Sequence, residues 1–165
     1  REVGERAAEL TEQLLAFGRR KMLRPCDVEA DRLVAEAGPA LRDVCGGNVE
    51  LAVRAGAAGG TVHVDPEGFR HMVIRLAASA CEGMQHVGSL ALQTTVAELG
   101  PSDAPEEVGL PRGEYVVLTF RDTGPGMDEE SLSRIFDPFH WSLDIGGGLE
   151  LASVYGFVKQ SGGDI

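Results

Sequence analysis

The sequence lacks a long apolar run. None approaches the roughly 18–20 residues that a membrane-spanning helix needs, and no signal-peptide pattern opens the sequence. Cysteine is also scarce, with three residues and no CxxC pair. An odd number without paired spacing argues against a disulfide framework and against a zinc site. We therefore expect a soluble, cytoplasmic protein with reduced thiols and no direct membrane contact.

Positive charge is in short supply, because 15 lysines and arginines face 26 aspartates and glutamates, for a formal net charge of −11. A field of this sign repels nucleic acid and acidic membrane surfaces, so neither is expected as a partner. It also opposes a polyphosphate ligand unless local cations, backbone amides or a metal offset it. The 43% of hydrophobic residues nevertheless suffices for one globular domain and argues against disorder.

The first stretch of the chain, from about Glu5 to Met22, predicts an amphipathic helix that ends before Arg24-Pro25. Its apolar seam consists of Ala7, Leu10, Leu14 and Phe17. A seam this narrow is typical of a helix that pairs with a partner helix. The alternative is a helix that folds back onto its own domain.

Two further helices are predicted in the first half of the chain. Apolar spacing indicates a helix over Asp31–Val44, in which Pro39 should produce a kink or a break. The clearest helix begins at Asp65-Pro66, a side chain suited to the N-cap followed by proline at the first helical position. Its core face repeats at helical spacing and consists of Phe69, Met72, Val73, Leu76, Ala77 and Ala80.

Alternating apolar residues predict four strands. Val49–Val53 and Thr61–Val64 are separated by a glycine-rich turn and are expected to form a hairpin. Strands are also expected at Ser89–Ala97 and Tyr115–Phe120. A short helix at Asp128–Ile135 and a final helix at Leu149–Gln160 complete the pattern. Since strands and helices do not alternate strictly, we expect an α+β fold with one mixed sheet covered by helices on one face.

Two glycine-containing segments are candidates for ligand contact. Asp122 ends a strand, and Gly124 and Gly126 follow it, so the backbone there can approach a flat ligand closely while the carboxylate accepts from an amino group. Gly146–Gly148 opens the last helix, where free amides and the helix dipole favour an anion. Taken singly, the first segment is consistent with a simple turn and the second with a flexible hinge.

The serial order of these segments resembles the ATP-binding catalytic domain of sensor histidine kinases, in particular hybrid ones with a receiver domain. The segments that carry the resemblance are Asp65–Met84, Asp122–Met127, Ile135–Phe139, Gly146–Gly148 and Ser153–Gly163. The Leu10–Arg20 stretch is similar to the end of the second dimerisation helix of those proteins. The resemblance thus divides the chain into a dimerisation-helix remnant, residues 1–24, and a catalytic domain, residues 25–165, whose final strands would follow Ile165.

This resemblance implies a Bergerat-type two-layer α/β sandwich that binds ATP and Mg²⁺. Asp122 would bind the adenine amino group, Gly124 and Gly126 would line the base and ribose, and Ser79 would be the metal ligand. The remaining ATP-binding positions are Met127, Gly146, Gly148, Leu149 and Glu82. The implied partners are a second copy, joined through the N-terminal helix, and a response-regulator receiver domain.

The resemblance places no catalytic residue in this chain. In the family, ATP phosphorylates a histidine on the dimerisation helices. The four histidines here all lie outside the first helix and cannot take that part: His63, His71, His86 and His140.

The sequence departs from the family pattern mainly at the phosphate and metal end. Arg75 and Ser79 stand where the family has two asparagines, and Cys81 stands where a basic residue is common. Glu150 replaces the third glycine of the glycine motif. The segment around Leu143 lacks the family's threonines and lysine and is about two residues shorter.

We therefore expect weak or lost ATP and Mg²⁺ binding and a regulatory, pseudokinase-like role. The alternatives are an active histidine autokinase domain with an unusual metal site, a histidine-phosphotransferase-like scaffold with a degenerate nucleotide site, or a different ATPase of the same superfamily.

Overall fold

A computed structural model of the chain describes residues 23–99, 110–137 and 148–165. The predicted N-terminal helix and the residues that follow Phe-Asp-Pro, including Trp141, Ser142 and Leu143, lie outside these ranges. The elements in chain order are β1 (Cys26–Glu29), α2 (Ala30–Cys45), β2 (Val49–Arg54), β3 (Thr61–Val64), α3 (Pro66–Gly83), β4 (Gly88–Leu99), β5 (Gly113–Asp122), α4 (Glu129–Ser133) and α5 (Gly148–Gln160). No helix in these ranges is long and apolar enough to cross a membrane.

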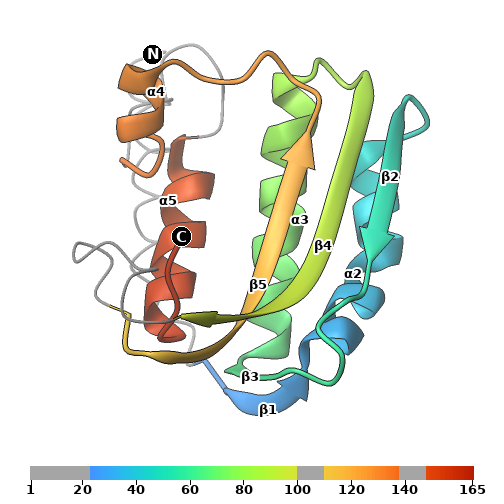
Figure 1. The fold of residues 1–165 in the computed structure, drawn as a ribbon. Helices are drawn as coiled ribbons and strands as arrows, with labels where there is room; N and C mark the ends of the chain where they lie inside the picture. The colour runs from blue at the N-terminus through green and yellow to red at the C-terminus, as the bar shows by residue number, and fades with distance from the viewer. Residues whose placement is uncertain (1–22, 100–109, 138–147) are drawn as a thin grey trace, which may run out of the picture.

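A mixed three-stranded sheet with the order β2-β4-β5 forms one layer. β2 runs parallel to β4, with Leu51 opposite Leu90, and β5 runs antiparallel to it, with Phe120 opposite Leu92. Helices α2 and α3 cover one face of this sheet, and α5 lies beside α3 (Figure 1). The prediction of a two-layer α+β fold with helices on one face is confirmed.

The predicted hairpin between the first two strands is wrong. β3 pairs antiparallel with β1, a strand that the sequence analysis did not identify, while β2 joins the main sheet beside β4. The linker between β2 and β3 turns away toward the start of α2, where the Ala30 N–H donates to the Gly60 carbonyl at 3.0 Å. The sequence analysis missed β1 because Cys26–Glu29 is only four residues long, is mostly exposed and includes two acidic side chains.

The core lies between the sheet and the two covering helices. Helix α3 buries Phe69, Met72, Val73 and Ala77 of its predicted apolar face, with Leu76 and Ala80 partly buried beside them. On α2, the buried face includes Leu33, Val34, Ala37 and Leu41. Pro39 does not break α2, which runs unbroken from Ala30 to Cys45. Proline removes only one helical hydrogen bond, and burial of the apolar face on both sides of it offsets that loss.

Two carboxylates cap helices, and the sequence analysis expected the first of these caps. Asp65 caps α3, since its Oδ1 accepts from the Gly68 N–H at 2.6 Å with Pro66 at the first helical position. Its Oδ2 accepts from the Arg24 N–H at 2.7 Å, which ties the start of the described chain to this helix. Asp128 caps α4 through the Ser131 N–H at 2.7 Å. Each cap satisfies a backbone donor that the helix itself leaves open.

A polar network joins the start of α2 to the middle of the sheet. Asp31 Oδ1 accepts from the hydroxyl of Thr94, which is fully buried in β4, and from the Ala57 N–H at 3.0 Å. The Thr94 hydroxyl in turn accepts from the Gly56 N–H at 3.0 Å. These bonds, led by that of Thr94, lower the pKa of Asp31 from its usual value. The carboxylate form of Asp31 therefore stabilises the fold.

We expect Thr94→Val to lower the thermal midpoint at pH 7, because Asp31 then loses its strongest donor and the Gly56 N–H loses its acceptor. The contribution of Asp31 is present above its unfolded pKa of about 4 and disappears as the pH falls through the lower native pKa. The gap between wild type and variant should thus narrow below about pH 4. Thermal unfolding of wild type and variant at several pH values measures this difference in midpoint.

Thr95→Val is the matched control, because Thr95 is next in the strand and points to the other, outer face of the sheet. It should change the midpoint little. A Thr94→Val deficit that stays constant from pH 7 to pH 3 would contradict the assigned role of Asp31.

Candidate functional site

Four parts of the chain come together at one end of the molecule. The C-terminal ends of β5 and α3, helix α4 and the N-terminal end of α5 all lie at the top of Figure 1. β5 carries Asp122 to this end as its last residue, and α5 begins there at Gly148. The topology thereby brings the predicted segments around Asp122, Ser79 and Gly148 to a single region.

Asp122 is exposed and held in a fixed direction. Its Oδ1 accepts from the Gly124 N–H at 2.8 Å, while its Oδ2 accepts no hydrogen bond from any residue that the structure describes. A carboxylate with one oxygen engaged by the backbone and the other open can accept from an exocyclic amino group. The assignment of Asp122 to adenine stays a prediction.

Thr123 fastens the turn after β5 to the rest of the site. Its hydroxyl accepts from the Ser89 N–H at 2.9 Å and lies 3.5 Å from the sulfur of Met84, and its own N–H donates to the Ser89 carbonyl at 3.2 Å. Met84 is 7% exposed and follows α3 directly. The contact therefore joins the end of α3 to the segment that carries Asp122.

Close packing at this turn requires glycine at two positions. A Cβ on Gly88 would lie 2.5 Å from the Thr123 hydroxyl, and one on Gly124 would lie 2.8 Å from Asp122 Oδ1. Gly126 has a positive φ of 75°, which side-chain-bearing residues rarely adopt. Met127, which follows, is half exposed and presents an apolar surface at the edge of the site.

One face of α3 looks toward α5 and carries Arg75, Ser79 and Glu82, at spacings of four and three residues. Ser79 is partly buried and Glu82 is exposed. Arg75 Nη1 donates to the hydroxyl of Ser153 on α5, and that hydroxyl donates to the Glu150 carbonyl at 2.6 Å in the first turn of α5. The sequence analysis did not foresee this link between the two helices.

Cys81 is fully buried behind this face, with its Sγ 3.7 Å from Cys45 Sγ. Burial, followed by the hydrogen bond with Cys45, raises the pKa of the Cys81 thiol to about 12, and the charge of nearby Asp122 adds to the effect. The thiol is therefore neutral. It supplies no positive charge beside Ser79, where the resemblance led us to look for a basic side chain.

Thiol labelling should separate the three cysteines. We expect Ellman's reagent to titrate Cys26, which is exposed, in the native chain at pH 8, and to reach Cys45 and Cys81 only after denaturation. The Cys26→Ser variant, as control, should give no native reaction. Rapid native labelling of Cys81 would show that this part of the site opens.

The donor set does not make a magnesium site by itself. Mg²⁺ is held in proteins by oxygen ligands, typically one or two carboxylates together with substrate phosphates. Here Ser79 offers a neutral hydroxyl and Glu82 a carboxylate one turn later. Within the described ranges, no group of three or more His, Cys, Asp or Glu side chains is placed to hold a metal ion.

The structure describes some of the predicted site residues and leaves others outside its described ranges. It brings Asp122 and Gly124 beside the end of α3, and places Gly148 and Leu149 in the first turn of α5. Gly146 lies outside the described ranges. The sequence analysis missed Met84, Thr123 and Ser153 as parts of the site. In the sequence, only the position of Thr123 next to Gly124 and that of Ser153 in the last helix pointed to them. Their contacts join residues that are distant in sequence, so no local pattern reveals them.

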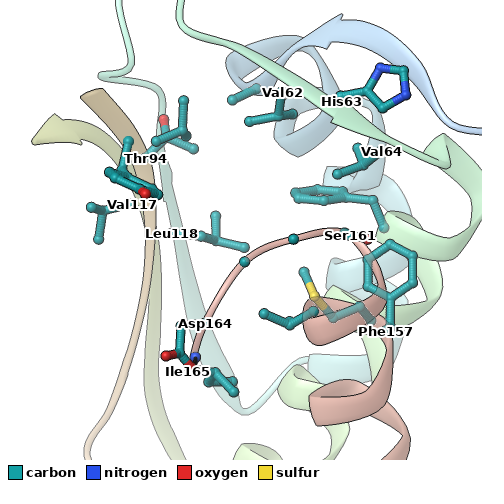
Figure 2. Close-up of a pocket in the computed structure, with 18 of the residues that line it drawn as sticks. Val62, His63, Val64, Thr94, Val117, Leu118, Phe157, Ser161, Asp164 and Ile165 are labelled. Carbon is teal, nitrogen blue, oxygen red and sulfur yellow. Dashed lines mark hydrogen bonds between the residues drawn. The ribbon is translucent and has the colours of Figure 1, made fainter. Parts of the chain in front are cut away.

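A separate cavity of about 640 Å³ opens at the other end of the sheet, between β3, β5 and the end of α5. Leu118 and Phe157 lie on opposite sides of it (Figure 2). No predicted site residue lines this cavity, and its wall is mostly apolar. A polyphosphate would lose its hydration there without gaining charged partners, so we do not place the nucleotide in it.

A two-layer sandwich with a fixed carboxylate at a strand end, a glycine turn and a polar helix face defines the class of α/β-sandwich nucleotide-binding ATPases. Residues 64–165, more than half of the chain, match the family "Histidine kinase-, DNA gyrase B-, and HSP90-like ATPase". The chain belongs to this family, as an ATPase domain of the sensor histidine kinase type.

Individual relatives agree with this assignment. The chain is 35% identical over 162 residues to the sensor kinase CckA of Brucella abortus (strain 2308), which covers 97% of the chain and 17% of that protein. It therefore spans a small part of the length of this relative. In fold it resembles histidine kinase ThkA in complex with the response regulator TrrA, with a TM-score of 0.65 at 15% identity, covering 98% of the chain and 42% of ThkA. It likewise resembles full-length ShkA in complex with AMPPNP, with a TM-score of 0.62 at 20% identity, covering 96% and 32%.

Proposed function

We propose that this chain is a sensor-kinase ATPase domain that keeps its adenine site but binds Mg²⁺-ATP weakly, and that it acts mainly as a regulatory module. The observation that carries the proposal is the contrast between the two ends of the site. The adenine end has an oriented carboxylate, whereas the phosphate end has lost charge-assisted donors and metal ligands.

The adenine end is supported by Asp122, whose open Oδ2 stands beside a turn packed on Met84 and Thr123. Because one oxygen is already held by the Gly124 N–H, the carboxylate does not need to reorient to receive an amino group. A preoriented acceptor of this kind costs less entropy on binding. Full-length ShkA, a protein of the same fold, is in complex with AMPPNP.

Weak binding at the phosphate end is supported by Ser79, Cys81 and Glu150. Ser79 is a neutral donor, Cys81 is an uncharged buried thiol, and Glu150 adds a negative charge in the first turn of α5. Each charge-assisted hydrogen bond to a phosphate contributes roughly 1.5–3 kcal/mol. Losing two of them would weaken ATP binding on the order of 100-fold or more, at about 1.4 kcal/mol per factor of ten.

The runner-up function is an active autokinase domain with an unusual metal site. It is favoured by the Ser79 hydroxyl, since a serine ligates Mg²⁺ in P-loop proteins. In either case we propose a cytoplasmic domain of a larger sensor kinase that dimerises through its N-terminal helix. A response-regulator receiver is the proposed partner, as ThkA is in complex with the response regulator TrrA.

The adenine site is tested by Asp122→Asn. The amide keeps the size of the side chain but presents a weaker acceptor, so we expect adenosine affinity to fall about tenfold or more. Calorimetric titration of wild type and variant with adenosine measures this. Glu98→Gln, at the far end of the sheet, is the matched control and should bind as wild type does. Equal adenosine affinity in Asp122→Asn and wild type would show that the base binds elsewhere.

The proposed loss of phosphate and metal ligands is tested by returning the family's residues to two positions. We expect the double variant Ser79→Asn, Glu150→Gly to bind ATP about tenfold or more tightly than wild type in the presence of Mg²⁺, since a metal ligand returns and a repelling charge is removed. Titration with adenosine should show no such gain. Tight, Mg²⁺-dependent ATP binding by the wild type itself would favour the active autokinase.

A further inference from the structure

Arg75 lies on the face of α3 that looks toward α5. It lies on the same face of α3 as Ser79 and Glu82, one turn before Ser79, and its side chain is exposed. Its guanidinium spans the space between α3 and α5, because Nη1 donates to the hydroxyl of Ser153. The side chain of Arg75 thus reaches the N-terminal half of α5.

The charge of Arg75 is not neutralised by a neighbouring carboxylate. Within the described parts of the chain, no Asp or Glu oxygen lies within ion-pair distance of it, whereas Arg32 pairs with Glu36 at 2.7 Å and Arg134 with Asp137 at 3.5 Å. A guanidinium has five N–H donors in a planar fork. Ser153 occupies one of them, and the others remain for an anion.

We propose, resting on the proposed function above, that Arg75 is the cationic phosphate ligand of this site and takes over the electrostatic role that a metal ion has in related domains. The guanidinium fork matches two phosphate oxygens at once and needs no coordinated ion. On this helix face Ser79 and Glu82 offer a metal ion one hydroxyl and one carboxylate, and the net charge of −11 repels a polyphosphate, so a local guanidinium is needed to offset that field. The site therefore binds ATP with little dependence on Mg²⁺.

Ser153 acts as a positioning residue for Arg75. Its hydroxyl is itself held by the Glu150 carbonyl at 2.6 Å, so its lone pairs face the guanidinium in a constant direction. This bond limits the rotamers of a long side chain before the ligand arrives, which reduces the entropy lost on binding. An exposed hydrogen bond to a neutral hydroxyl is also weak enough to be rearranged when a phosphate competes for the same donors.

The test is titration of the 165-residue chain with ATP and with adenosine, each with Mg²⁺ and with EDTA. For wild type we expect the ATP affinity measured with Mg²⁺ and the ATP affinity measured with EDTA to agree within about threefold, because Arg75 and not the metal ion neutralises the phosphates. A threefold difference is well below the tenfold that 1.4 kcal/mol represents. Arg75→Gln keeps an amide donor for Ser153 but removes the charge, and should weaken ATP binding about tenfold or more while adenosine binding is unchanged. Arg70→Gln, on another side of α3, is the matched control and should change neither.

The outcomes separate this inference from the proposed function. If wild type binds adenosine through Asp122 but Arg75→Gln binds ATP as wild type does, or if ATP binds only with Mg²⁺, the role of Arg75 is overturned and the adenine site stands. If neither ligand binds wild type, both proposals fall. Thermal unfolding of each variant is measured in parallel. If Arg75→Gln loses both ATP affinity and folded protein, Arg75→Lys separates the two causes. The lysine variant keeps the charge and should bind ATP more tightly than the glutamine variant.

Discussion

The packing of α3 on the sheet, between α2 and α5, is the constraint on which the rest of the structure depends. Its apolar face is buried against α2 and β4, and its other side faces α5 and carries the polar residues of the site. Burial of side chains such as Val73 and Ala77 fixes the rotation of the helix about its axis. That rotation in turn decides that Arg75, Ser79 and Glu82 look toward the N-terminal half of α5.

The contact between Met84 and Thr123 extends this constraint to the turn after β5. Met84 directly follows α3, and Thr123 directly follows Asp122, so the end of the helix and the Asp122 carboxylate are held to one another. Gly88 and Gly124 keep the contact close, since a Cβ at either would collide with its partners. The position of Asp122 is thus a consequence of core packing, and the proposed function uses this to account for an adenine site that is kept while the phosphate end changes.

Arg75, Ser79 and Glu150 are exposed or partly exposed on two helices, and none of them belongs to the buried core. Their identity can therefore change with little effect on the packing, so the chemistry of this face is less constrained than the fold. The proposed function rests on this freedom. A guanidinium across α3 and α5 is one way in which charge can return to such a site.

Local patterns in the sequence determined the helices from α2 to α5, the long strands, the N-cap of α3 and the order of the glycine-containing segments, because periodicity, caps and glycine turns act over a few neighbouring residues. Tertiary structure alone decided that β3 pairs with β1 rather than with β2, since both choices satisfy the same alternation. It also decided that Pro39 is tolerated within α2 and that Arg75 meets Ser153, 78 residues further along the chain. Contacts of this separation depend on how whole elements pack, and no local pattern encodes them.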